Sequence, residues 1–168
     1  MNFAGNRTSE TRTTRVELKN GKLSIWQGPT QPALEFDYVE GRLLGIEVRR
    51  RKTSNGEMTY VDFHFINDDE FFDVSTIASS SVAADLVGRL SNVKSPTEST
   101  IRIDAWKNDR YTNVHVKENG ASVPFLRLPS VQKVDKGFKV ELDSSERDAA
   151  VMSLIEKINS RIQAGQAN

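Results

Sequence analysis

The segment from Ile101 to Lys117 constrains the fold more than any other, because apolar and polar residues alternate on both sides of a short turn. Successive side chains of a β-strand point to opposite faces, so this pattern predicts two strands joined at Lys107-Asn108-Asp109. One predicted face is a plain core face, made of Ile101, Ile103, Ala105, Thr112, Val114 and Val116. The other face carries Arg102, Asp104, Trp106, Tyr111, Asn113, His115 and Lys117.

This second face combines aromatic rings with cations. Such a combination is uncommon on a sheet face that contacts only solvent. A single nucleic acid strand offers bases that stack on aromatic side chains and phosphates that attract Lys and Arg. The pattern therefore indicates a binding face for a single strand. The alternative is that an N-terminal hairpin or a C-terminal helix covers Trp106 and Tyr111, since those elements have apolar faces that must pack somewhere.

The central part of the chain predicts three further strands, at residues 41–52, 59–67 and 71–77. Asn55-Gly56 lies between the first two and is a strong hairpin signal, because these residues adopt a positive φ at low cost. In the first strand the expected core face is Leu44, Ile46 and Val48. The expected outward residues of the first two strands include Arg49, Arg51, Tyr60 and His64.

Two segments have helical rather than strand periodicity. Ser80 or Ser81 is placed to cap a short helix, whose apolar stripe is Val82, Ala83, Leu86, Val87 and Leu90. Near the C-terminus, residues 145–148 have capping-box spacing and precede a predicted helix over 145–162. Its apolar residues recur at helical spacing: Val151, Leu154, Ile155, Ile158 and Ile162.

The domain organisation expected from these signals is simple. Residues 1–15 are polar and are predicted to form a flexible tail, and residues 164–168 a loose end. Residues 16–163 form one β-barrel domain, which begins with a hairpin around Asn20-Gly21. After the Ile101–Lys117 hairpin, further strands are expected over 122–128, 131–134 and 138–142.

The order of these elements predicts a mostly β fold with two helices. A meander of three strands, a helix and two more strands is the order of the OB-fold, a small Greek-key barrel. The N-terminal hairpin and the C-terminal helix would decorate this barrel. The competing architecture is a pleckstrin-homology-like barrel, in which several strands are closed by one C-terminal helix. The terminal helix suits that architecture, whereas the helix in the middle of the chain does not.

Composition narrows the function classes. The chain has 168 residues and no cysteine, so disulfides, thiolate catalysis and zinc–thiolate or iron–sulfur sites are excluded. No apolar run approaches the roughly 20 residues of a membrane span, and residues 1–15 lack a secretory signal, so we expect no membrane partner and a cytoplasmic location. With 23 basic and 23 acidic residues the net charge is zero, which argues against a histone-like protein. The charges are nevertheless segregated, and Arg49-Arg50-Arg51-Lys52 is the densest basic run.

No catalytic or metal-binding pattern is present in the sequence. The acidic residues Asp62, Asp68-Asp69-Glu70 and Asp73 lack EF-hand spacing, so a solvated turn is favoured over a metal site. His64 and His115 do not match a known catalytic constellation and are expected to be surface or stacking residues. We therefore expect no enzyme activity, no cofactor and no metal.

The strand pattern over residues 40–128, and the segment from Trp106 to Lys117 in particular, resemble single-stranded DNA-binding proteins of the OB-fold type. The likeness is closest to divergent ones from phages and mobile elements of gut bacteria. The resemblance implies that the outward strand residues line a DNA groove. Bacterial members usually end in an acidic tail with an apolar tip, whereas this chain ends with residues 163–168 after a helix, so recruitment of partners by such a tail is not implied.

Two functional hypotheses follow from the sequence. In the first, the protein binds single-stranded DNA in replication or recombination without catalysis. Stacking is assigned to Trp106, Tyr111 and Tyr60, phosphate neutralisation to Arg49, Arg51, Arg102 and Lys117, and places on the same face to His64 and His115. In the second, it is a protein-interaction or assembly module of a phage or mobile element. The apolar helix would then dock within the chain or across a dimer, which leaves a homo-oligomer open.

Overall fold

A computed structural model describes residues 13–124, 131–134, 138–141 and 144–166. These residues form a mostly β structure with two helices, as the sequence predicts. The strands of the main sheet are β1 (Thr14–Lys19), β2 (Lys22–Ile25), β3 (Leu34–Phe36), β4 (Tyr38–Thr53), β5 (Gly56–Asn67), β6 (Glu70–Ile77), β7 (Ile101–Asn108), β8 (Tyr111–Glu118) and β9 (Ala121–Ser122). A separate hairpin consists of β10 (Val131–Val134) and β11 (Phe138–Glu141), and the helices are α1 (Ser81–Leu90) and α2 (Ser144–Gln166).

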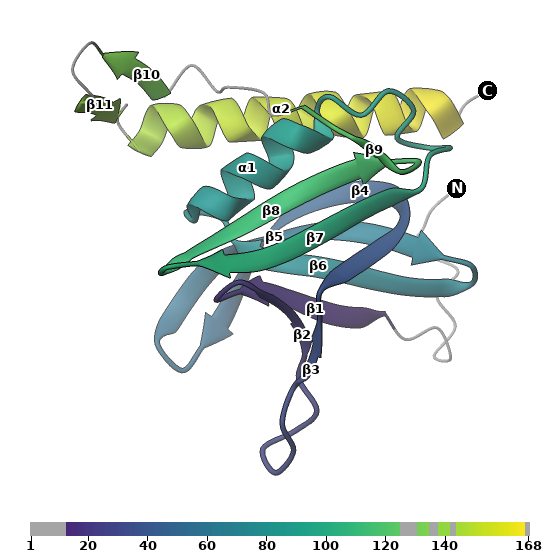
Figure 1. The fold of residues 1–168 in the computed structure, drawn as a ribbon, viewed down its shortest axis with the longest axis vertical. Coiled ribbons are helices and arrows are strands. Elements are labelled where there is room, and N and C mark those ends of the chain that lie inside the picture. The colour runs from purple at the N-terminus through teal and green to yellow at the C-terminus, as the bar shows by residue number, and fades with distance from the viewer. Residues whose placement is uncertain (1–12, 125–130, 135–137, 142–143, 167–168) are drawn as a thin grey trace.

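The main sheet has nine strands in the order β3-β2-β1-β6-β5-β4-β7-β8-β9. All neighbouring strands are antiparallel except β1 and β6, which run parallel. β4 changes its pairing partner along its length: Tyr38–Gly41 pairs with β7, and the rest of the strand, from Arg42, pairs with β5. The sheet bends where the partner changes (Figure 1). At the bend a Cβ on Gly41 would lie 2.8 Å from the carbonyl oxygen of Ile66, so this position requires glycine.

The sheet is not closed by strand pairing, so the expected closed barrel is not confirmed. Its two halves do approach each other, because the turn between β1 and β2 touches the β7–β8 hairpin. The N–H of Gly21 donates a hydrogen bond of 2.8 Å to Oγ1 of Thr112. A Cβ on Gly21 would lie 2.4 Å from Cβ of Lys107, so the close approach also depends on glycine.

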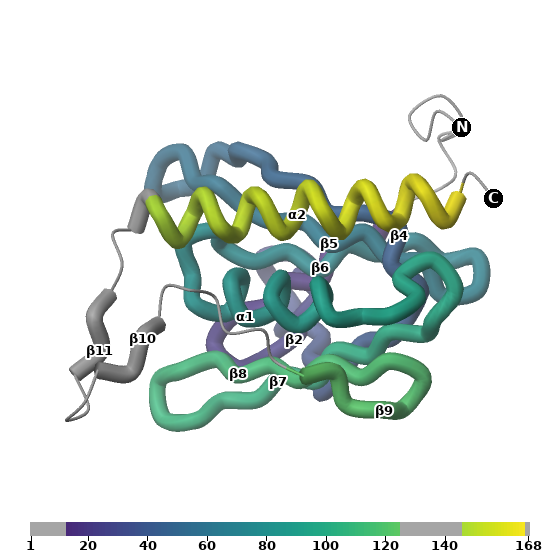
Figure 2. Tube along the Cα trace, turned by 90° about the horizontal axis from the view of Figure 1, so that it is seen from above, coloured from purple at the N-terminus to yellow at the C-terminus, as the bar shows by residue number. Residues whose placement is uncertain are grey.

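Both helices lie on the same side of the molecule (Figure 2). Ser80 caps α1 by accepting a hydrogen bond of 3.2 Å from the N–H of Ala83. Helix α1 packs against β8 and α2, and α2 packs against β4, so the terminal helix docks within its own chain. The predicted stripe of α2 is confirmed, because Val151, Ile155, Ile158 and Ile162 are buried and Leu154 is partly buried. The helix continues to Gln166, so the prediction of a loose end is wrong for residues 164–166.

The predicted core face of β4 is wrong at one position. A β-bulge between Leu43 and Gly45 adds a residue to the strand, and an extra residue exchanges the two faces of a strand. Leu43 is therefore buried and Leu44 only partly so, while Ile46 faces the core as expected.

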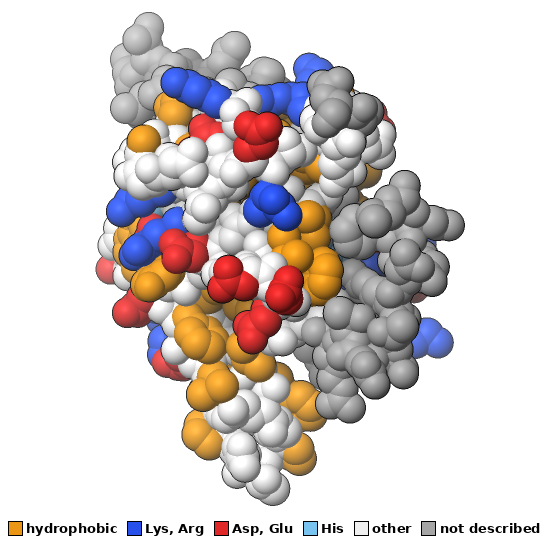
Figure 3. Space-filling model, turned by 90° about the vertical axis from the view of Figure 1, so that its right-hand side faces the viewer, with side chains coloured by type: hydrophobic (Ala, Val, Ile, Leu, Met, Phe, Trp, Pro, Cys, Tyr) orange, Lys and Arg blue, Asp and Glu red, His pale blue; other side chains and the backbone are white. Residues whose placement is uncertain are grey.

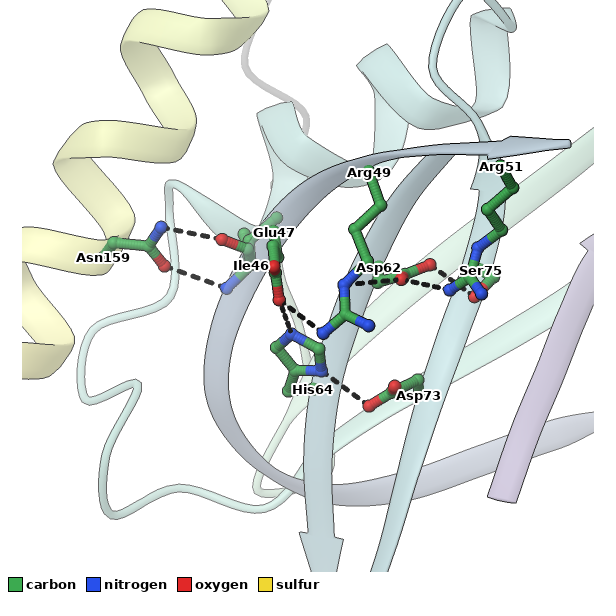
Figure 4. Close-up of polar contacts among 9 residues, drawn as sticks. All are labelled: Ile46, Glu47, Arg49, Arg51, Asp62, His64, Asp73, Ser75 and Asn159. Carbon is green, nitrogen blue, oxygen red and sulfur yellow. Dashed lines mark hydrogen bonds and ion pairs between the residues drawn. The ribbon is translucent and has the colours of Figure 1, made fainter. Parts of the chain in front are cut away.

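Asn159 of α2 replaces a strand partner just beyond this bulge. Its side chain accepts a hydrogen bond of 2.9 Å from the N–H of Ile46 and donates one of 2.8 Å to the carbonyl oxygen of Ile46 (Figure 4). The amide thus satisfies both backbone groups where β4 has left β7.

Other predictions concern the ends of elements. β1 begins at Thr14, so the predicted tail is wrong for residues 14 and 15, and its remainder through residue 12 lies outside the described residues. The β10–β11 hairpin is confirmed, although its turn at 135–137 is not described. Of the strand expected over 122–128, only Ser122 is in a described strand, and residues 125–130 are not described.

Neither described helix combines the length and the apolar character that crossing a membrane requires.

Candidate nucleic-acid interface

The structure separates the nine predicted site residues into two groups on different parts of the bent sheet. Four lie on β4 and β5: Arg49, Arg51, Tyr60 and His64. Five lie on the β7–β8 hairpin: Arg102, Trp106, Tyr111, His115 and Lys117. We call the outward side of this hairpin the hairpin face. The two groups differ in what their side chains contact.

The hairpin face has the alternation that the sequence predicts. Its outward residues oppose each other in four cross-strand pairs: Arg102 with Lys117, Asp104 with His115, Trp106 with Asn113, and Asn108 with Tyr111. Trp106 and Tyr111 are therefore diagonal neighbours, which in an antiparallel pair lie about 7–8 Å apart. Their exposed fractions are 47% and 60%, so neither ring is covered by the N-terminal hairpin or the terminal helix.

The cations of the hairpin face are only partly neutralised. Arg102 donates hydrogen bonds of 2.8 and 3.0 Å to Asp104, and its guanidinium carbon lies 3.6 Å from the ring centre of Tyr38. Arg110, in the turn, lies 5.7 Å from the ring centre of Tyr111. Among the described residues, Lys117 has no ion pair. Two exposed rings thus share this hairpin with four cations and three acids: Arg102, Lys107, Arg110, Lys117, Asp104, Asp109 and Glu118.

Tyr38 is a member of this surface that the sequence did not identify. It lies at the start of β4 and opposes Asp104 in the ladder between β4 and β7. Pairing between strands more than 60 residues apart has no local sequence signal. Tyr38 is 44% exposed, so it adds a third accessible ring beside Arg102.

The second group belongs to an ion network on β4, β5 and β6, consisting of Glu47, Arg49, Arg51, Asp62, His64, Asp73 and Ser75 (Figure 4). Its centre is Asp62, which is fully buried. Asp62 accepts hydrogen bonds of 2.6 Å from Ser75 and 2.5 Å from Arg51, and Nε of Arg49 lies 3.5 Å away. A buried carboxylate is costly unless it is paired and hydrogen-bonded, so the two arginines stabilise Asp62.

His64 lies between two carboxylates in the same network. Its Nδ1 is 2.6 Å from Asp73 and its Nε2 is 3.1 Å from Glu47, which also accepts a hydrogen bond of 2.6 Å from Arg49. Burial lowers the pKa of His64, but the hydrogen bonds and charges of Asp73 and Glu47 outweigh it and the pKa is raised overall. The hydrogen bond from Arg49, with a smaller contribution from His64, lowers the pKa of Glu47 against the opposing effect of burial. The arrangement favours an imidazolium that donates from both nitrogens.

Tyr60 is enclosed by cations rather than open to a base. The guanidinium carbons of Arg15 and Arg51 lie 4.9 and 5.8 Å from its ring centre. Cation–π contacts of this kind hold the ring between strands β1 and β4. Tyr60, His64, Arg49 and Arg51 are therefore engaged with neighbouring side chains, and the structure does not bring them to the hairpin face.

The described residues contain no group of three side chains that could hold a metal ion. Asp62 and Asp73 face arginine and histidine, whereas Asp68, Asp69 and Glu70 are exposed at the turn between β5 and β6. The expected solvated turn is therefore confirmed for Asp68, Asp69 and Glu70, and it is wrong for Asp62, which is buried, and for Asp73, which is mostly buried.

No family model, curated protein or solved structure matches this chain. The assignment of a function therefore depends on the geometry of the chain itself.

Proposed function

We propose that the hairpin face binds single-stranded DNA without catalysis, as a protein of replication or recombination would. The observation that supports this best is the exposure of Trp106 and Tyr111 on diagonal positions of one hairpin, beside cations. Stacking of a base on such a ring contributes about 1–3 kcal/mol. Two adjacent rings would hold neighbouring bases of a strand that crosses the hairpin.

The cations of the same hairpin would make the phosphate contacts. Lys117 and Arg110 are the better placed, whereas Arg102 is shared with Asp104 and Tyr38. His115 opposes Asp104 and lies one cross-strand pair from Lys117 and one from Trp106. The proposed site is thus smaller than the sequence alone suggested, since Arg49, Arg51, Tyr60 and His64 are occupied within the sheet.

We further propose that β4 to β8 form an OB-like Greek-key core. The strand order β6-β5-β4-β7-β8 supports this, because β7 returns after α1 to lie beside the first strand of the β4–β5–β6 meander. OB-folds bind oligonucleotides on a strand face and the adjoining loops. In this chain β1 pairs with β6, which adds a hairpin at the edge of the meander.

A fluorescence titration with oligo-dT at two salt concentrations tests the function. The chain has two tryptophans, so the Trp26→Phe variant makes Trp106 the sole reporter. We expect quenching of Trp106 at low salt and weaker binding at high salt, with a slope of about −0.7 per phosphate contact. In Trp106→Phe, where Trp26 reports alone, we expect little quenching. Absence of both quenching and binding at low salt would refute the proposal.

The first prediction is that Trp106→Ala or Tyr111→Ala weakens oligo-dT binding by roughly 5- to 150-fold, the equivalent of 1–3 kcal/mol. The matched control is Trp26→Ala, because Trp26 is 73% exposed and lies outside the hairpin face. Anisotropy of a labelled oligo-dT measures all three. Equal losses in Trp26→Ala and Trp106→Ala would show that exposed aromatic surface in general, not the hairpin face, governs binding.

A further inference from the structure

A second surface lies between β3, the start of β4 and the turn joining β5 to β6. It is a groove of about 970 Å³, which we call the acidic groove. Its apolar lining includes Val16, Ile25, Phe36, Val39, Phe71 and Phe72. Phe36 and Tyr38 are 39% and 44% exposed, so part of this lining is open to a ligand.

The charged side chains that line the groove are all acidic, and Arg102 lies at its rim, against the ring of Tyr38. Its lining includes Glu35, Asp37, Glu40, Asp69 and Glu70, and contains no Lys, Arg or His. Lys22 pairs with Glu35 at 2.9 Å, which leaves four carboxylates without a described ion pair. Figure 3 shows acidic side chains gathered beside apolar ones, above the projecting segment between β2 and β3. A nucleic acid or an anionic membrane would be repelled here, whereas a cationic ligand would be attracted.

One wall of the groove is an open strand edge. β4 pairs with β5 only from Arg42 onward, and Asn67 of β5 already donates a hydrogen bond of 3.0 Å to the carbonyl oxygen of Glu40, so the part of the edge without a described partner is at Tyr38. The carbonyl oxygen of Asp37 accepts a hydrogen bond of 3.1 Å from Ala105 in β7. Because backbone groups alternate direction along a strand, those of Tyr38 point away from β7, toward the groove. An exposed edge of this kind accepts the backbone of an extended peptide.

We propose that the acidic groove binds an extended segment of a partner protein in which Lys or Arg alternates with apolar residues. The apolar residues would contact Phe36 and Phe72, the cations would face the rim carboxylates, and the backbone would pair with β4 at Tyr38. This proposal does not depend on DNA binding by the hairpin face. Together the two would let a DNA-bound protein hold a second protein.

The test uses a fluorescein-labelled peptide, Lys-Phe-Lys-Val-Lys-Phe-Lys-Val, and the full chain. We expect saturable anisotropy that weakens with salt, and roughly tenfold weaker binding by the Asp69→Lys/Glu70→Lys variant. The control variant Glu57→Lys/Glu156→Lys has the same net charge, and both of its residues are exposed outside the groove. It should bind the peptide like the unchanged protein. A peptide with proline at both valines should bind more weakly, because proline lacks the backbone donor.

Equal binding by the groove variant and the control variant would overturn the proposal, as would equal affinity for the peptide Glu-Phe-Glu-Val-Glu-Phe-Glu-Val. Phe36→Ala provides a second test if the turn variant does not fold, and it should also weaken binding. Trp106→Ala should bind the peptide normally, so that loss of DNA binding and loss of peptide binding are separable.

Discussion

The β4–β5 and β7–β8 hairpins have similar outward patterns but different surroundings. The outward face of each carries two or more cations together with an aromatic ring and a histidine. On β4–β5 the arginines face Asp62 and Glu47, and two guanidinium groups contact the ring of Tyr60. On β7–β8 the rings of Trp106 and Tyr111 are exposed. The comparison shows that similar outward patterns can be neutralised by an ion network on one hairpin and leave aromatic rings accessible on another.

The second prediction has the largest expected effect on stability and tests whether the β4–β5 network is structural. Asp62→Ala should lower the free energy of unfolding by about 3 kcal/mol, because it removes the buried partner of Arg51 and Ser75. Breaking a buried ion pair usually costs more when the remaining partner is left without solvent. The expected loss here is at the low end, because the side chains of Arg49 and Arg51 are partly exposed to solvent. Urea denaturation measures the change.

The matched control for Asp62→Ala is Asp104→Ala on the hairpin face. Asp104 pairs with Arg102 but its side chain is 22% exposed, so the expected loss is at most about 1 kcal/mol. Similar losses in the two variants would remove the distinction between the hairpins.

The third prediction concerns the salt dependence of DNA binding. Lys117→Gln should reduce the slope of log affinity against log salt by about 0.7, the value for one lost phosphate contact with a single strand. Arg49→Gln should leave the slope unchanged, because Arg49 is held by Glu47 at 2.6 Å. Titrations of oligo-dT at several salt concentrations measure both slopes. A reduced slope in Arg49→Gln would mean that the β4–β5 hairpin also contacts the DNA.

Much of the fold follows from local patterns. The Asn55-Gly56 turn joins β4 to β5, and residues Val151 to Ile162 form the buried stripe of α2. That same turn sets the register that places Glu47 opposite Asp62, so the acidic partners on β4–β5 were accessible to sequence reasoning. The bulge at Leu43–Gly45 has no comparable signal.

Contacts between distant strands limit what the sequence predicts about the site. The parallel pairing of β1 with β6 puts Arg15 near Tyr60, and the pairing of β4 with β7 puts Tyr38 under Arg102. Both bring together residues that are more than 40 positions apart, and neither has a turn or a periodicity that specifies it. These contacts decide which rings are enclosed and which are accessible.

The fourth prediction has the smallest expected effect and concerns how the free energy of unfolding depends on pH through the β4–β5 network. The pKa of His64 is raised above its ordinary value of 6.5 in the folded protein, so folding favours the protonated imidazole. Its contribution to stability is therefore complete below about pH 6.5 and is lost as the pH rises through the raised pKa. The free energy of unfolding should fall as the pH rises above about 6.5 in the unchanged protein and fall less in His64→Gln.

The other histidine provides the control for this effect. Among the described residues, His115 has no hydrogen bond to a carboxylate, so His115→Gln removes an imidazole without breaking such a contact. The pKa of Glu47 is lowered from 4.5, so its own contribution is present above that value and is lost only in more acidic solution. The difference in decline between the unchanged protein and His64→Gln is thus assigned to His64, because the raised pKa of Asp85 affects both proteins equally. An equal decline in His64→Gln would mean that the two carboxylates do not hold the imidazolium, and the β4–β5 face would then be less firmly neutralised than its geometry indicates.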